Sequence, residues 1–93
     1  MTKKYRVVET PGFLDDLQQD FKGQKSRIHR KLQEYVYLQL MNQPHFGSNI
    51  KKLKDYSPET WRYRIGDYRF FYEIDEKSKF IIMIAAGSRS ESY

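Results

Sequence analysis

The sequence predicts an α+β fold in which an N-terminal strand, a helical hairpin and then a three-stranded antiparallel meander form one twisted sheet. Three observations lead to this prediction. A short β-branched segment opens the chain, apolar residues recur at helical spacing through the first half, and the period changes to two from Thr60 onward. A chain of 93 residues is large enough for one core and too small for two, so residues 1–93 are expected to form a single domain.

The first strand and the first helix are expected at the beginning of the chain. The segment KYRVVE, Lys4 to Glu9, is short and has a β-branched centre, as strands often do. Thr10 is a good helix N-cap and Pro11 suits the first helical position, so a helix should begin there and run for about three turns to Gly23. Its apolar face would be formed by Phe13, Leu14, Leu17 and Phe21.

A longer helix is expected from Gln24 to about Asn42, ending before Pro44. The tight turn at Gly23 should fold the two helices into an antiparallel hairpin. The buried positions of this second helix are predicted to be Ile28, Leu32, Tyr35, Val36 and Leu40.

The second half of the chain should be mostly strands. The segment IKKLKDYSPET, residues 50–60, is polar, basic and rich in turn formers, which favours a loop. Gly66 and Asp67 then form a two-residue hairpin turn between two alternating strands. The segment FIIMIAA, Phe80 to Ala86, is apolar on both faces and typical of a central strand.

The turn at Gly66 fixes the register of the hairpin RYRIGDYRFFY, Arg62 to Tyr72. One face of the hairpin would belong to the core, with the pairs Ile65 and Tyr68, Tyr63 and Phe70, and Trp61 and Tyr72.

The other face of the same hairpin carries an arrangement that stability does not explain. The register places Arg64 opposite Arg69 and Arg62 opposite Phe71. Like charges directly opposite each other destabilise a strand pair, by about 0.2–1 kcal/mol. An anion between two guanidiniums would reverse the sign, because each is a rigid fork of donors suited to phosphate oxygens, and Phe71 would offer a flat surface for a base. The residues therefore fit either a phosphodiester site or exposed arginines that a carboxylate such as Glu73 neutralises.

The composition limits the chemistry. Without cysteine, neither a disulfide nor a thiolate metal site can form, and His29 and His45 alone are too few for a metal site. No cofactor is implied. No apolar run approaches the roughly 18 residues of a membrane span, so a soluble cytoplasmic protein is expected. A net charge of +5 suits a polyanion or an acidic protein partner.

The order of elements, the segment KKLKD, the hairpin WRYRIGDYRFFYEID and the ending GSRSESY together resemble the RelE/ParE superfamily of bacterial and archaeal toxins from type II toxin-antitoxin pairs. The resemblance covers nearly the whole chain and is strongest from Leu53 to Tyr93. It implies a compact fold similar to the microbial ribonucleases. For the RelE branch it implies an mRNA interferase, a metal-independent endoribonuclease that enters the ribosomal A site and cuts messenger RNA with the RNA's own 2′-hydroxyl as nucleophile.

Five residues match the site residues of the RelE branch: Arg62, Arg64, Arg69, Arg89 and Tyr93. The resemblance implies that Arg64 and Arg69 stabilise the added negative charge of the phosphorane. Arg89 would stabilise or protonate the 5′-oxygen leaving group, and Tyr93 would stack on a base to align the attack. Arg62 would hold a flanking phosphate.

The residues leave alternatives for two points: the group that accepts the proton of the 2′-hydroxyl, and the branch of the superfamily. RelE-type sites have a lysine where Arg64 lies, and arginine stays protonated in proteins. Glu91, the carboxylate of Tyr93 and ribosomal RNA are the remaining candidates for a base, and a non-catalytic RNA-binding protein is an alternative. The ParE branch shares the fold but poisons DNA gyrase and cleaves no RNA; the presence of Arg89 and Tyr93 argues against it.

Other basic residues suggest binding rather than chemistry. Lys51, Lys52 and Lys54 precede the arginine strand and would contact RNA phosphates near its edge. The segment KGQKSRIHRK, Lys22 to Lys31, is either a solvated helix face or a contact surface for ribosomal RNA. The expected partners are the ribosome, its messenger RNA and a cognate antitoxin that orders on the basic face.

Overall fold

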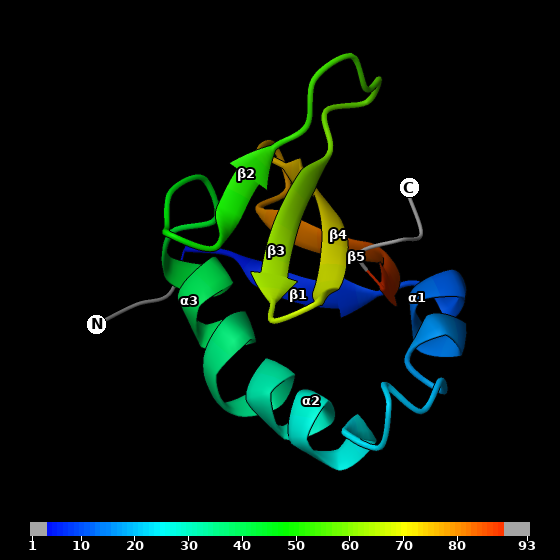
Figure 1. Cartoon of the computed structure of the whole chain (residues 1–93). Helices are drawn as coiled ribbons and strands as arrows, with labels where there is room; N and C mark the ends of the chain where they lie inside the picture. The colour runs from blue at the N-terminus through cyan, green and yellow to red at the C-terminus, as the bar shows by residue number, and fades with distance from the viewer. Residues whose placement is uncertain (1–3, 89–93) are drawn as a thin grey trace.

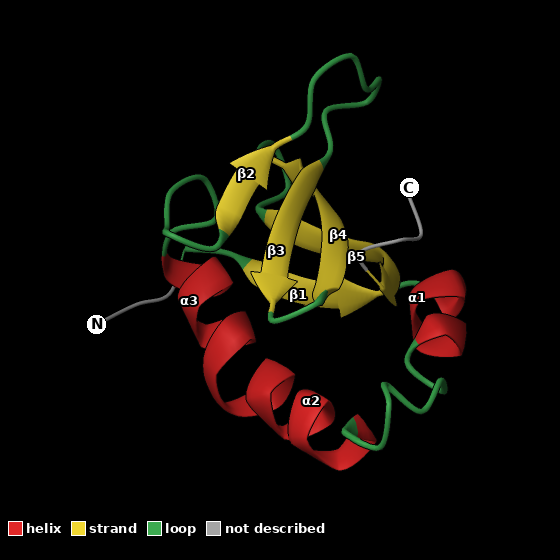
Figure 2. Cartoon of the chain, viewed as in Figure 1, coloured by secondary structure: helices red, strands yellow, loops and turns green. Residues whose placement is uncertain are grey.

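A computed structural model describes residues 4–88, in which helices lie along one face and one end of a twisted, five-stranded mixed sheet (Figures 1 and 2). The strands are β1 (Arg6–Glu9), β2 (Ile50–Lys52), β3 (Trp61–Ile65), β4 (Tyr68–Asp75) and β5 (Phe80–Ser88). The helices are α1 (Pro11–Asp16), α2 (Lys25–Lys31), the π-helical turn η1 (Leu32–Val36) and α3 (Tyr37–Asn42). The α+β class is confirmed.

The sheet has one strand more than the sequence predicted. Its order is β1-β5-β4-β3-β2, with β1 parallel to β5 and every other pair antiparallel. The loop expected over residues 50–60 was wrong at its start, because Ile50 to Lys52 pair with β3 as an edge strand. Three residues are too short for a clear period of two, so the pairing comes from the available edge of β3 and from Ile50, which packs against the core.

The first helix begins as predicted and ends early. Thr10 caps it, since its hydroxyl accepts a hydrogen bond from the Phe13 amide at 3.1 Å. The prediction that the helix reaches Gly23 was wrong, because α1 ends at Asp16. Leu14, expected on the buried face, is 45% exposed.

The chain leaves the helix so that one aromatic ring can enter the core. Phe21, Lys22 and Gly23 have φ angles of +53°, +55° and +82°, which a right-handed helix cannot contain. Phe21 is buried there, and its ring meets the ring of Tyr68 edge-on with centroids 5.0 Å apart. Burying an aromatic ring of this size is favourable and stabilises the loop.

The second helical segment runs from Lys25 to Asn42, close to the predicted bounds. The π-helical turn in its middle shifts the faces that follow. Tyr35, predicted to be buried, is 55% exposed for this reason, and Tyr37 is buried instead. The hydroxyl of Tyr37 donates a hydrogen bond to Glu9 at 2.6 Å, which ties α3 to β1. The other four predicted positions are buried: Ile28, Leu32, Val36 and Leu40.

The register of the β3–β4 hairpin is confirmed at all five pairs. Gly66 has a φ of +57°, as the first central position of a type II′ turn requires. Tyr63, Phe70 and Tyr72 are fully buried between the sheet and the helices, while the other face of the hairpin carries the arginines. No helix within residues 4–88 is both long and apolar enough to cross a membrane.

Candidate functional site

The face of the sheet opposite the helical layer carries a cluster of cations. Alternation along β3 and β4 places Arg62, Arg64 and Arg69 on this face, and the pairing of β2 adds Lys51, which lies opposite Arg62. We call these four residues the basic strip. The structure brings three of the predicted catalytic residues and one predicted RNA-binding residue together on adjacent strands.

Arg64 and Arg69 are the closest pair of the strip along the backbone. The amide of Arg64 donates to the carbonyl of Asn49 at 3.0 Å, on the side away from β4. Arg64 and Arg69 therefore form a non-hydrogen-bonded pair, the kind in which opposite Cα atoms approach to about 4.5 Å. Nε of Arg64 donates to the carbonyl of Gly66 at 3.2 Å, so this side chain runs along the hairpin toward its turn. On its other side Arg69 lies opposite Gly87 of β5, which has no side chain to cover it.

Arg62 lies deeper than the other two arginines. Its side chain is half-buried, and its Nε is buried without a hydrogen-bond partner in the described part of the chain. Burial lowers the pKa of Arg62, and the positive charges of Arg69 and Arg64 lower it further. An anion beside Arg62 would relieve both effects, because it would supply an acceptor and an opposite charge.

No carboxylate in the described part of the chain forms an ion pair with the strip. Among residues 4–88, the ion pairs are those of His45 and Lys79 with Glu76 and of Lys52 with Glu59, and none involves an arginine. Glu73 shares the face of the strip by alternation, but no ion pair joins it to the cations within that range. The alternative interpretation, in which carboxylates of the same chain neutralise the arginines, is therefore not supported within this range.

The predicted RNA-binding residues occupy different positions. Lys51 lies on the strip, whereas Lys52 lies opposite Trp61 on the other face of β2, and its amine is 2.9 Å from a carboxylate oxygen of Glu59. Lys54 is exposed in the loop beyond β2. These three lysines do not form one surface.

Phe71 lies opposite Arg62, as the register requires, but only 3% of it is exposed. The open stacking surface expected from the sequence is therefore not present in this structure. Contact between Phe71 and RNA stays a prediction that requires the ring to be uncovered.

Two predicted site residues, Arg89 and Tyr93, lie outside the described residues, as does Glu91. Within residues 4–88, the structure contains no cluster of three or more His, Asp or Glu side chains that could hold a metal ion. The chemistry that the basic strip offers is stabilisation of negative charge by its guanidiniums.

The sequence matches the profile of a known family over residues 7–93, nearly its whole length. The family is described as the ParE toxin of the type II toxin-antitoxin system parDE. The chain belongs to the RelE/ParE toxin superfamily. It is therefore a toxin of a type II toxin-antitoxin system. A comparison with curated proteins found no match.

Several solved structures similar to this toxin are described as RelE toxins or RelE–RelB complexes. The RelE–RelB complex of Pyrococcus horikoshii OT3 is 24% identical with a TM-score of 0.68, covering 96% of this chain and 99% of that one. The RelBE2 complex of Mycobacterium tuberculosis is 23% identical with a TM-score of 0.73, covering 98% of each chain. The isolated RelE toxin of E. coli is 17% identical with a TM-score of 0.67, covering 95% of this chain and 87% of that one. At these identities the likeness shows a shared fold.

Sequence reasoning missed two features of the toxin's site. It did not find β2, whose pairing is what places Lys51 beside Arg62. It also treated Tyr68 as an ordinary core residue, although its buried hydroxyl has no hydrogen-bond partner in the part of the chain that the structure describes. No periodic signal in the sequence marks either feature, because the three residues of β2 are too few to show a period of two.

Proposed function

We propose that this toxin is a ribosome-dependent endoribonuclease of the RelE type, which acts in the cytoplasm and cuts messenger RNA in the ribosomal A site. The observation that supports the proposal most is the basic strip, where Arg64 and Arg69 lie opposite each other and no carboxylate within residues 4–88 forms an ion pair with them. Such a pair favours an anion with several oxygens, and a phosphodiester between two nucleosides is that kind of anion.

The proposed reaction is attack of the 2′-oxygen on the adjacent phosphorus. The O–P bond forms as the 2′-hydroxyl loses its proton, and the bond from phosphorus to the 5′-oxygen breaks as that oxygen gains one, which leaves a 2′,3′-cyclic phosphate on one fragment and a 5′-hydroxyl on the other. Negative charge grows on the non-bridging oxygens in between. Guanidiniums of Arg64 and Arg69 held beside these oxygens would stabilise that charge without reorganisation, and one such contact contributes about 10²–10³ in rate.

The remaining site residues would bind or orient other parts of the same RNA. Arg62 would bind the neighbouring phosphate, because its buried Nε lacks an acceptor within residues 4–88 and because burial, and then the nearby cations, lower its pKa. Arg89 would assist the leaving 5′-oxygen and Tyr93 would stack on a base. Arg89 follows Gly87 by two residues in the sequence, and Gly87 lies opposite Arg69, which supports this role.

A cognate antitoxin is the second proposed partner. The solved relatives include complexes with RelB antitoxins. An acidic or amphipathic segment that orders over the basic strip would neutralise its charge and block RNA at the same time.

The family profile supports one alternative, inhibition of DNA gyrase, because the matching family is named for ParE. The experiment that separates the two is brief expression of the toxin, followed by mapping of messenger RNA ends in translating cells and a supercoiling assay with purified gyrase. New ends within ribosome-bound codons support the RNase proposal. Intact messages with inhibited gyrase would overturn it in favour of the ParE activity.

A further inference from the structure

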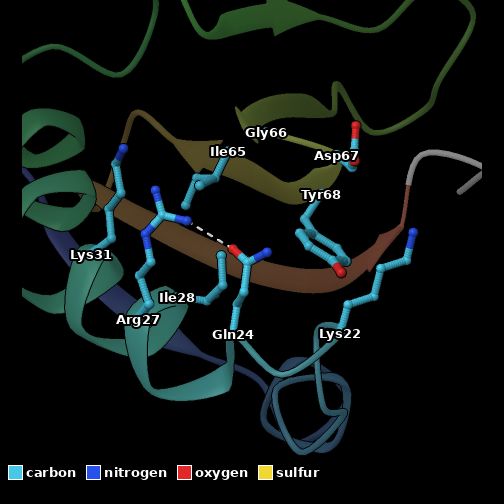
Figure 3. Close-up of a pocket in the computed structure, with 9 residues that line it drawn as sticks. All are labelled: Lys22, Gln24, Arg27, Ile28, Lys31, Ile65, Gly66, Asp67 and Tyr68. Atoms are coloured by element: carbon cyan, nitrogen blue, oxygen red, sulfur yellow. Dashed lines mark hydrogen bonds between the residues drawn. The ribbon is translucent and has the colours of Figure 1, made fainter.

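A separate polar pocket opens on the helical side of the β3–β4 hairpin, at the tip of the turn (Figure 3). Its volume is about 280 Å³. Its polar lining comes from the loop before α2, from α2 and from the turn: Lys22, Gln24, Arg27, Lys31, Asp67 and Tyr68. Pockets for apolar small molecules are usually about 300–1,000 Å³ and mostly apolar, so this one suits a small charged group better.

The charges in the pocket favour an anion. The lining contains three cations, Lys22, Arg27 and Lys31, and one carboxylate, Asp67. None of the four takes part in an ion pair within the described range. Arg27 donates from Nη1 to Oε1 of Gln24 at 2.8 Å, which fixes the guanidinium across the pocket (Figure 3). The other donors of that guanidinium stay available to a ligand.

The buried hydroxyl of Tyr68 also favours an acceptor in the pocket. Tyr68 is 5% exposed, and its oxygen has no hydrogen-bond partner in the described segment. Its ring lies between the side chains of Gln24 and Lys22, with the hydroxyl directed toward the loop that carries Lys22 (Figure 3). A buried donor without an acceptor is unfavourable, so an acceptor supplied by a ligand in the pocket would be favourable.

The pocket is connected to the basic strip through the turn. Gly66 lines the pocket, and the carbonyl of the same residue accepts the hydrogen bond from Nε of Arg64. The Arg64 side chain therefore reaches the tip of the hairpin from one face, while Arg27 and Lys31 approach it from the other. A chain of evenly spaced anions that lies on the strip can continue over the turn into the pocket.

We propose that the turn pocket is a second phosphodiester site, which binds the sugar–phosphate backbone of RNA several nucleotides away from the linkage held by Arg64 and Arg69. The assignment rests on the proposed function, because the strip must bind RNA for the backbone to reach the pocket. A sugar–phosphate chain is preferred over an acidic peptide because Gly66 contacts Arg64 of the strip and also lines the pocket, so one regularly spaced chain of anions could reach both. The pocket contributes affinity without reading the base sequence.

The test uses the full chain and a fluorescent, fully 2′-O-methylated RNA, which cannot be cut because its nucleophile is blocked. Anisotropy gives the affinity for a 12-nucleotide probe and for a dinucleotide over a series of salt concentrations. The variant R27Q/K31Q should bind the 12-mer about tenfold more weakly at low salt. Its salt slope should fall by about 1.4, which corresponds to two lost phosphate contacts at about 0.7 each. The affinity for the dinucleotide, which spans only the strip, should change less than twofold.

A matched control removes the same charges from the same helix outside the pocket. Lys25 and Arg30 lie on α2 and do not line the pocket, so K25Q/R30Q should change 12-mer affinity less than threefold. Equal losses in the two double variants would overturn the pocket assignment, because they would reflect net charge alone. Weaker binding of a 12-residue polyglutamate peptide by R27Q/K31Q, with RNA binding intact, would also overturn it.

A third variant separates failure of this inference from failure of the proposed function. R64Q/R69Q should weaken binding of the dinucleotide and the 12-mer alike. Full dinucleotide binding by R64Q/R69Q would refute the strip as an RNA site, whatever the pocket variant shows. Loss of binding in R64Q/R69Q without any loss in R27Q/K31Q would refute the pocket alone.

Discussion

Arg64 and Arg69 lie directly opposite each other across β3 and β4, and neither forms an ion pair with a carboxylate within residues 4–88. The hydrophobic pairs on the other face of the hairpin hold this register, so the two guanidiniums cannot separate by a slip of one residue. The sheet therefore keeps two like charges together at a cost in stability, and that cost gives the first test.

Replacing Arg69 with Gln should lower the cleavage activity without lowering the stability of the fold. The variant is expected to unfold at an equal or higher denaturant midpoint, with a gain of up to about 1 kcal/mol, because the repulsion with Arg64 is removed. Cleavage of ribosome-bound message should fall by about 10²–10³. Urea unfolding and mapping of RNA ends measure the two effects. A variant that loses stability would show that Arg69 has a structural role instead.

Inorganic phosphate should stabilise the toxin through the strip. A ligand at ten times its Kd adds about 1.4 kcal/mol, which raises the Tm of a domain of this size by roughly 6–11 °C. The measurement is a thermal scan with phosphate against chloride at matched ionic strength. R64Q/R69Q is the control and should respond less. An equal response in both proteins would mean that phosphate acts by general exclusion from the surface.

Acid should weaken a contact between the β4–β5 turn and the start of the chain. The hydrogen bond from the Tyr5 hydroxyl, at 2.8 Å, lowers the pKa of Glu76 below its ordinary value of 4.5, and hydrogen bonds from His45 and Lys79 lower it further. A carboxylate with a depressed pKa stabilises the fold above its unfolded pKa, and this is lost as the pH falls through the folded pKa.

The difference in unfolding free energy between the wild type and Glu76→Gln should therefore be constant above about pH 5 and shrink below pH 4.5. It should be small throughout, because 53% of the Glu76 side chain is exposed. Urea unfolding between pH 3 and pH 6 gives the profile. A difference that grows toward acid would contradict the assigned direction of the shift.

Two tyrosines of β4 offer a matched pair of variants. The hydroxyl of Tyr72 is buried and donates to the carbonyl of Pro44 at 2.7 Å, whereas the buried hydroxyl of Tyr68 has no partner in the described chain. Tyr72→Phe should cost about 1–2 kcal/mol, because it leaves a buried carbonyl unsatisfied. Tyr68→Phe should cost nothing or stabilise slightly. Equal losses in the two variants, measured by urea unfolding, would show that Tyr68 does have a partner in solution.

The β3–β4 hairpin was the most predictable part of the molecule. Its turn at Gly66 and strict alternation define the register from local sequence alone, which is why the opposition of Arg64 and Arg69 could be predicted. The start of α1 at Thr10 was predictable for the same reason, because capping depends on adjacent residues.

The missed features depend on distant contacts. The first helix ends at Asp16, and the chain then turns so that the ring of Phe21 is buried against Tyr68, a residue 47 positions later by the difference of their numbers. The π-helical turn exposes Tyr35 although its spacing fits the apolar face. The edge strand β2 forms because β3 offers it a partner. None of these contacts leaves a periodic signal in the sequence.

The position of β5 between β1 and β4 also determines how late in its synthesis the toxin can complete its sheet. Arg6 pairs with Phe80, so the N-terminal strand has no neighbour in the sheet until almost the entire chain has left the exit tunnel. Pairing over so long a separation is intrinsically slow. A nascent chain interrupted anywhere before Phe80 would lack β5, the strand that pairs with both β1 and β4, so truncated products should not form the toxin fold.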